Sequence, residues 1–172
     1  MDERKGLGVL LSAFELIQQR LPEARLVLAG EGPLREMIES EIREQGWERS
    51  VLLAGFVDDA AAIMQAIDVL LLPSYWEGFG IVILEAMACG RPVITTNISS
   101  MPEIVDDGRT GYLIPPGATA ALAERAVELL QNKSLRESMG RAGRARVAEH
   151  FSHDVMIDRL EKLFHREAHR SG

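Results

Sequence analysis

The sequence contains few cysteine, histidine and aromatic residues, and it lacks a long apolar run. Its one cysteine, Cys89, excludes a disulfide within the chain, favours a reducing compartment and is expected to be a small buried thiol. The four histidines all lie near the C-terminus without a carboxylate constellation, so we predict no metal site. No segment resembles a secretory signal or a membrane span. We therefore expect a cytoplasmic protein, with the inner face of the membrane as a second place where it could act.

Basic residues are outnumbered by acidic residues, 19 to 26. The 172 residues carry a formal net charge of −7, which makes a general nucleic-acid surface improbable. Any phosphate that the protein binds must therefore be held by local groups. The length is enough to bury a core and corresponds to one domain, or to one lobe of a larger enzyme.

Short apolar runs alternate with segments of helical period along the chain. This pattern predicts an α/β protein with a Rossmann-like parallel sheet and helices on both faces. Only helices are expected from about residue 119 onward. The predicted strands are 25–29, 51–56, 69–72, 93–96 and 112–114, and the predicted helices are 7–20, 34–45, 60–66, 81–89, 102–105, 119–131, 134–150 and 152–169.

Ligands bind open sheets of this kind beyond the carboxyl ends of the strands. Four loops that follow predicted strands should therefore border one crevice: 30–33, 56–58, 74–80 and 95–101. The Gly30-Glu31-Gly32 segment of the first loop can equally be a plain turn from strand to helix.

The segment EGFGIVILEAMACGRPVIT, residues 77–95, is the most informative part of the chain. Glu77 and Glu85 are separated by seven residues, and a turn of Gly78, Phe79 and Gly80 leads directly into an apolar helix. Glycines allow a tight turn and close approach of a ligand. The helix that starts near Ile81 would point unpaired N–H groups at that ligand, which suits a phosphate.

Glu85 lies inside this helix, and its neighbours are apolar on every side, which predicts a buried helix. A buried carboxylate needs partners, and a vicinal diol such as that of ribose can donate to both carboxylate oxygens. Glu77 would then face whatever lies beyond the phosphates. The alternative interpretation makes Glu85 a solvated helix residue and Glu77 an ordinary loop residue.

Several motifs together resemble one family. From Lys5 to about Phe164, the chain is similar to the C-terminal, donor-binding lobe of retaining glycosyltransferases of family 4, also called group 1, which have the two-lobed GT-B fold. The motifs are Lys5-Gly6, AGEGPL at 29–34, LAGFVDD at 53–59, PSYWEGFGIVILEAMACGRPVI at 73–94, MPEIVDDGRTGYLIPPG at 101–117 and Phe151-Ser152.

The resemblance implies that residues 1–172 form a single nucleotide-sugar-binding lobe of an enzyme that transfers a sugar to an acceptor hydroxyl. Glu77 and Lys5 would be the catalytic residues, contacting the donor sugar and the diphosphate respectively, and Glu85 would hold the ribose. The remaining substrate-binding residues implied are Gly78, Phe79, Gly80, Ile81, Val82, Gly30, Gly32, Phe56 and Val57, the last two beside the base. The alternative for Lys5 is an exposed lysine near the chain end.

The resemblance also implies partners and cofactors. The donor would be a UDP- or GDP-linked sugar, the acceptor could lie at a membrane surface, and no metal would be needed because Lys5 and a helix N-terminus replace it. Three other functions are alternatives to sugar transfer. The first is a binding module or inactive fragment without turnover, and the second is an epimerase or phosphorylase of the same fold. The third is a flavodoxin-like regulator, for which the acidic pairs Asp58-Asp59 and Asp106-Asp107 are poor support.

Two departures from the family stand out. The family places a strand ending in Gly-Arg before Lys5, whereas this sequence has Met1 to Arg4 there and Arg4 does not match that arginine. The N-terminal acceptor lobe is also absent, so we expect the chain alone to be incomplete for catalysis. In the usual strand order the missing strand is the central one. Strands 25–29 and 69–72 should then either pair directly or keep open edges that favour low stability or self-association.

Overall fold

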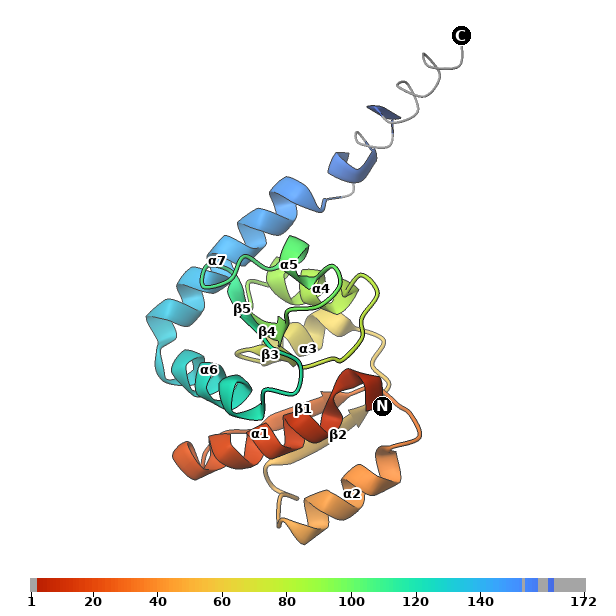
Figure 1. Cartoon of the computed structure of the whole chain (residues 1–172), viewed down its shortest axis with the longest axis vertical. Helices are drawn as coiled ribbons and strands as arrows, with labels where there is room; N and C mark the ends of the chain where they lie inside the picture. The colour runs from red at the N-terminus through yellow and green to blue at the C-terminus, as the bar shows by residue number, and fades with distance from the viewer. Residues whose placement is uncertain (1–2, 153, 158–160, 163–172) are drawn as a thin grey trace.

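A computed structural model describes residues 3–152, 154–157 and 161–162 (Figure 1). Strands and helices alternate, and each predicted element up to residue 150 is present with bounds that agree within about one residue, so the α/β prediction is confirmed. The strands are β1 (Leu26–Ala29), β2 (Val51–Gly55), β3 (Leu70–Leu72), β4 (Val93–Thr96) and β5 (Gly111–Ile114). The helices are η1 (Glu3–Lys5), α1 (Leu7–Arg20), α2 (Arg35–Glu44), α3 (Ala60–Ala66), α4 (Ile81–Ala88), α5 (Met101–Ile104), α6 (Thr119–Gln131) and α7 (Lys133–His150).

The predicted C-terminal helix, 152–169, is only partly covered by the structure. Residues 154–157 and 161–162 are helical. The rest of the predicted helix, including His153, His165 and His169, lies outside the described residues. Among the helices that are described, none has the length and apolar character needed to cross a membrane.

The strands form two parallel sheets instead of one. One sheet has the order β1-β2 and the other has the order β3-β4-β5, and no backbone hydrogen bond among the described residues joins β1 to β3. The two sheets lie at different levels of the molecule (Figure 1). The sequence left two arrangements open for β1 and β3, direct pairing or open edges. The structure excludes direct pairing of β1 with β3.

Both inner edges leave backbone donors unused. The amides of Leu26 and Gly30 donate to the Ser50 and Gly55 carbonyls at 2.9 and 2.6 Å, so the N–H of Val27 between them points to the opposite side of β1. Leu70 N–H donates to the Pro92 carbonyl at 3.1 Å, so the Leu71 N–H points away from β4. Neither the Val27 nor the Leu71 N–H has an acceptor among the described residues, so each sheet presents a strand edge with free donors.

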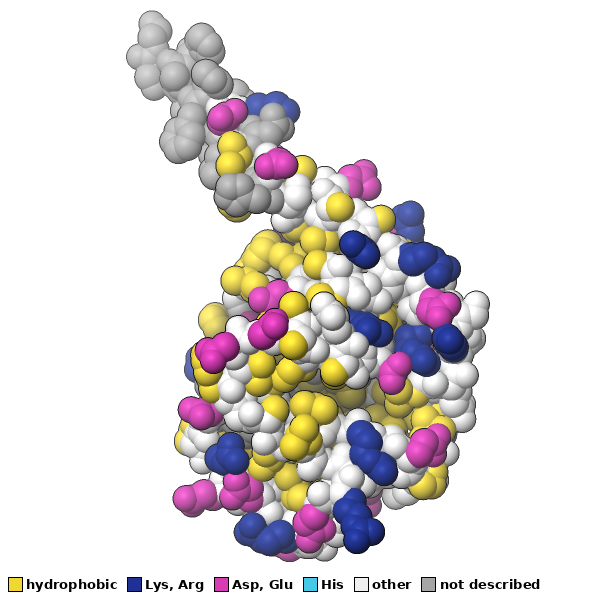
Figure 2. Space-filling model, turned by 180° about the vertical axis from the view of Figure 1, so that it is seen from behind, with side chains coloured by type: hydrophobic (Ala, Val, Ile, Leu, Met, Phe, Trp, Pro, Cys, Tyr) yellow, Lys and Arg dark blue, Asp and Glu magenta, His cyan; other side chains and the backbone are white. Residues whose placement is uncertain are grey.

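Apolar packing holds the two sheets together. One continuous core cluster contains side chains from β1 and β2, from β4 and β5, and from helices α1, α2, α6 and α7. Viewed from behind, the surface shows hydrophobic side chains gathered in a hollow at mid-height (Figure 2). The most deeply buried members of this cluster include Leu11, Phe14, Ile17, Ile94, Leu122, Ala126 and Leu129.

Strand β4 is covered on both faces, as a doubly wound fold requires. Successive strand side chains point to opposite faces. Ile94 accordingly joins the core shared with α1 and α6, whereas Val93 joins a second core formed with α4 and α5. All four β4 residues are buried.

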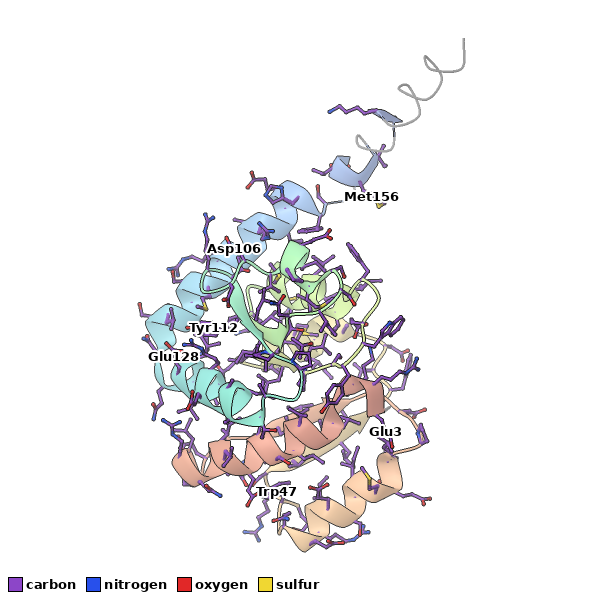
Figure 3. The ribbon with its side chains drawn as sticks, viewed as in Figure 1. Glu3, Trp47, Asp106, Tyr112, Glu128 and Met156 are labelled. Atoms are coloured by element: carbon purple, nitrogen blue, oxygen red, sulfur yellow. The ribbon has the colours of Figure 1, made fainter. Side chains whose placement is uncertain are left out.

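Helix α6 is fastened to β5 by a polar cluster beside this core. The Arg125 guanidinium lies 4.4 Å from the centre of the Tyr112 ring and its Nη1 donates to Glu128 at 2.8 Å. Burial, followed by the hydrogen bond with Glu128, raises the pKa of Tyr112. Tyr112 and Glu128 lie close together on β5 and α6 (Figure 3). No hydrogen bond or ion pair among the described residues joins this cluster to the loops described below, so we assign it a structural role.

We expect the open edges of β1 and β3 to make the protein self-associate or to lower its stability. Sedimentation velocity over a concentration series should show dimers or larger species. Val27→Pro removes only an N–H on the open edge, so it should reduce self-association and keep the β1-β2 ladder.

Leu26→Pro is the matched control, because it removes the N–H that pairs with Ser50. It should lower the melting temperature much more than Val27→Pro does. A stable monomer at every concentration would contradict the expectation.

Candidate functional site

The loop after β3, residues 73–80, forms the centre of the candidate site and is held by the segment before α1. The Tyr75 N–H donates to the Arg4 carbonyl at 2.8 Å. A Cβ on Gly6, whose φ is 67°, would lie 2.0 Å from the Pro73 carbonyl oxygen, so only glycine allows this close approach. The 3₁₀ turn η1 is thereby fixed beside the loop.

The structure brings Lys5 and Glu77 together. Lys5 Nζ lies 2.6 Å from Glu77 Oε2, and Ser74 Oγ donates to the same oxygen at 3.3 Å. The Glu77 side chain is only 13% exposed, against 47% for Lys5. The other carboxylate oxygen, Oε1, has no hydrogen-bond partner among the described residues, so it can accept from a ligand hydroxyl.

The Gly78-Phe79-Gly80 turn leads into α4 as predicted. Gly80 is the N-cap residue of α4 in the left-handed conformation, with φ 73° and no side-chain cap. The next two residues, Ile81 and Val82, have N–H groups with no acceptor among the described residues. These donors and the helix dipole favour an anion in front of α4.

The prediction that α4 is buried on every side is wrong. Ile81 is 65% exposed, and only Ile83, Ala86 and Met87 are buried. An apolar composition does not tell which side of a helix its neighbours cover, and here α3, α7 and β4 cover one side. Glu85 is half-buried and has no hydrogen bond or ion pair among the described residues, so its carboxylate can still serve a ligand.

The other predicted residues lie on the second sheet. Gly30 and Gly32 follow β1, Phe56 and Val57 follow β2, and the Gly30 N–H donates to the Gly55 carbonyl at 2.6 Å. Phe56 is 72% exposed. No hydrogen bond or ion pair in the described part of the chain joins these four residues to Lys5 or Glu77. The structure therefore arranges the predicted residues in two groups, one on each sheet, with Glu85 in contact with neither through a polar interaction.

Three hydroxyl side chains that no sequence pattern above singled out donate hydrogen bonds to the central loop or to the end of β3 just before it. Thr95 Oγ1 donates to the Leu72 carbonyl at 2.9 Å, and Thr96 Oγ1 donates to the Ser74 carbonyl at 2.6 Å. Farther along, Ser100 Oγ donates to the Gly78 carbonyl at 2.8 Å. The run TTNISS at 95–100, at the end of a predicted strand, is the signal that could have identified them, because such residues often bond to backbone groups.

A metal ion at the candidate site would need a cluster of His, Cys, Asp or Glu side chains. Within the residues that the structure describes, no three His, Cys, Asp or Glu side chains lie close enough to hold a metal ion. The positive charge beside the central loop comes from Lys5, from Arg4, whose guanidinium lies 5.8 Å from the centre of the Trp76 ring, and from backbone amides.

Comparison with known structures defines the class of protein. TarM of Staphylococcus aureus, solved with UDP, superposes with a TM-score of 0.90 at 25% identity over 95% of this chain and 34% of that chain. HepE of Anabaena, solved with UDP-glucose, gives a TM-score of 0.87 at 25% identity over 96% of this chain and 46% of that chain. The fold is the Rossmann-like lobe of GT-B glycosyltransferases.

The family follows from the sequence. The model of glycosyl transferases group 1 matches residues 1–146, and the chain belongs to this family. The N-acetyl-alpha-D-glucosaminyl L-malate synthase of Bacillus anthracis is 36% identical over 161 residues, which are 94% of this chain and 42% of that protein. The chain thus spans less than half the length of the curated relatives that it matches.

Gly80→Ala tests the geometry of the turn. A Cβ at this position would lie 2.7 Å from Met101 Cε, and φ is left-handed. The change should therefore lower the free energy of unfolding by about 1–2 kcal/mol.

Gly78→Ala is the matched control, because a Cβ there meets nothing within 4 Å. Urea denaturation of both variants provides the measurement. Equal losses of stability would contradict the described turn.

Proposed function

We propose that the chain is the donor-binding lobe of a glycosyltransferase that transfers a sugar from a nucleoside diphosphate to an acceptor hydroxyl with retention of configuration. The observation that carries this proposal is the Lys5–Glu77 pair, held at 2.6 Å, with Glu77 three residues before the N-cap of α4, whose first two N–H groups have no acceptor among the described residues. A cation, free N–H donors and a carboxylate with one free oxygen match a diphosphate joined to a polyhydroxylated sugar.

The roles divide along the ligand. The diphosphate lies in front of α4, where Lys5 and the amides of Ile81 and Val82 meet its charge. Glu77 Oε1 accepts a hydrogen bond from a hydroxyl of the sugar, and the half-buried Glu85 accepts hydrogen bonds from the two ribose hydroxyls. Gly30 and Gly32, with Phe56 and Val57, line the base on the other sheet.

UDP is the nucleotide that we favour. The complexes of TarM with UDP and of HepE with UDP-glucose support this choice, since both proteins share the fold along nearly all of this chain. The acceptor and the second wall of the cleft would come from another lobe, as the larger size of the relatives suggests.

The chemistry assigned to this lobe is stabilisation of the leaving group. The bond between the anomeric carbon and the diphosphate oxygen breaks, and its electron pair stays on the diphosphate. The acceptor oxygen forms the new bond to the anomeric carbon, and its proton passes to the departing diphosphate oxygen, which has kept the electron pair. Lys5 and the fixed amides meet the growing negative charge on the diphosphate, which is electrostatic catalysis by preorganised donors. Glu77 positions the sugar, and we assign no nucleophile.

The experiment that tests the proposal is a calorimetric panel of UDP, GDP, ADP and UDP-glucose against this chain. A ligand that binds only the folded state also raises the melting temperature, which gives an independent readout. Binding of none of these nucleotides would refute the proposal. Binding without any sugar transfer or hydrolysis would favour the rival function, a nucleotide-sugar-binding module.

Substitution of the two glutamates should separate the two ends of the ligand. Glu85→Gln removes a charged acceptor worth about 1.5–3 kcal/mol, so UDP affinity should fall roughly ten- to a hundredfold. Glu77→Ala should instead leave the affinity for UDP unchanged or slightly raised, because the diphosphate then no longer competes with Glu77 for Lys5, and should weaken UDP-glucose. Isothermal titration measures both effects.

Pyrophosphate is the control ligand, because it lacks ribose and should bind equally well to Glu85→Gln. If pyrophosphate loses as much affinity as UDP, the ribose assignment is wrong. Equal losses of UDP and UDP-glucose in Glu77→Ala would contradict the sugar assignment.

Binding should not require a divalent cation, because Lys5 and the α4 amides supply the positive field. EDTA should therefore leave the affinity for UDP unchanged. A loss of about tenfold on chelation that magnesium or manganese restores would correspond to about 1.4 kcal/mol and would overturn this expectation.

A further inference from the structure

One short segment, Ser99 to Met101, contacts the turn of Gly78, Phe79 and Gly80. Ser100 Oγ donates to the Gly78 carbonyl at 2.8 Å. The Met101 side chain, fully buried, fills the space where a Cβ of Gly80 would lie, with Met101 Cε at 2.7 Å from that position. Two consecutive residues thus contact both glycines of the turn.

The Ser100 side chain does not cap helix α5. Ser100 is the N-cap residue of α5, where a serine hydroxyl normally accepts a hydrogen bond from the first turn of the helix. Here the side chain makes no such capping bond. Its hydroxyl instead donates to the Gly78 carbonyl, a residue 22 positions earlier in the chain.

The backbone next to Ser100 is also unusual. Ser99 has φ 47°, the only non-glycine residue with positive φ in the described part of the chain. This left-handed conformation is unfavourable for a residue with a Cβ, and it persists only where the surrounding structure imposes it. The strain therefore lies directly beside the residue that contacts the turn.

The hydrogen bond to Gly78 fixes more than one carbonyl. The peptide that links Gly78 to Phe79 is planar, so its C=O and N–H groups point in opposite directions. With the Gly78 carbonyl directed at Ser100, the Phe79 N–H is directed away from Ser100. This N–H has no acceptor among the described residues.

Besides the bond from Ser100, no hydrogen bond among the described residues fixes the orientation of this peptide. Gly78 lacks a Cβ, and nothing lies within 4 Å of where one would be, so neither side-chain packing nor sterics holds the preceding backbone. On the other side, Phe79 is half exposed, and its ring packs edge-on against Phe151 with 6.4 Å between centroids, a contact of the side chain that makes no bond to the Gly78–Phe79 peptide. Ser100 supplies the interaction that selects one peptide orientation.

We propose that Ser100 is a positioning residue that turns the Phe79 N–H toward the ligand, where this N–H donates to a diphosphate oxygen together with the amides of Ile81 and Val82. This inference rests on the proposed function. It adds a third backbone donor to the anion site and identifies the side chain that orients it.

The test compares Ser100→Ala with Ser100→Thr, which keeps the hydroxyl. Ser100→Ala should weaken UDP binding by about three- to tenfold, the value of one hydrogen bond, whereas Ser100→Thr should bind almost as well as the unsubstituted protein. Because the hydroxyl bond is at the surface, the melting temperature should change little. Ser99→Asn is the matched control, since asparagine tolerates the left-handed conformation and the Gly78 contact remains.

Amide NMR gives a second measurement that does not depend on a variant. In the unsubstituted protein, UDP should move the Phe79 N–H signal downfield, as a new hydrogen bond requires. In ligand-free Ser100→Ala, the Phe79 signal should shift or broaden, because the peptide is no longer held in one orientation.

The outcomes separate this inference from the proposed function. If UDP binds but Ser100→Ala keeps full affinity, or the Phe79 signal does not move, the positioning role is refuted while the proposed function stands. Equal losses in the alanine and threonine variants also refute it. If UDP does not bind at all, the proposed function fails, and an unchanged Phe79 signal in ligand-free Ser100→Ala would refute the orienting role as well.

Discussion

The packing of helix α1 against helix α6 is the contact on which the rest of this structure depends. The two sheets share no hydrogen-bond ladder, so side chains such as Leu11, Phe14 and Leu122 must hold them together. Burial of one such side chain contributes about 1.5–3 kcal/mol. One ladder hydrogen bond contributes only about 0.5–1.5 kcal/mol net. Several buried side chains therefore outweigh the hydrogen bonds that the open strand edges lack, and the two halves form one core without a continuous sheet.

The geometry of the candidate site follows from the same contact. Lys5 ends the η1 turn just before α1, whereas Glu77 follows β3 on the other sheet. A partly exposed ion pair contributes at most about 1 kcal/mol, which is too little to position two segments of chain. The 2.6 Å distance between Lys5 and Glu77 is thus a consequence of how α1 packs and of the close approach of Gly6 to Pro73. Changes in the α1 core would reach the site through this route.

Local patterns predicted the elements well, and tertiary relations less well. The bounds of α3 and α6 agree with the predicted 60–66 and 119–131, because apolar period and turn residues are encoded locally. The Glu-Gly-Phe-Gly segment also correctly predicted a turn that opens α4. The exposure of one side of α4 could not be predicted, since it depends on which neighbours cover the helix. The bond from Ser100 to Gly78 could not be predicted either, because it joins residues that only the folded loops bring together.

The Lys5–Glu77 pair gives the proposed site a way to distinguish ligands. The protein is acidic overall, and Lys5, which lies beside this loop, is already paired with a carboxylate. A free nucleoside diphosphate can replace Glu77 as the partner of Lys5, but it offers Glu77 no donor in return. A nucleotide sugar offers both an anion for Lys5 and a hydroxyl for Glu77, so neither group loses a partner. Under the proposed function, the ion pair therefore lowers the affinity for the released diphosphate relative to the intact donor, which is the order of affinities that a transferase needs to release its product.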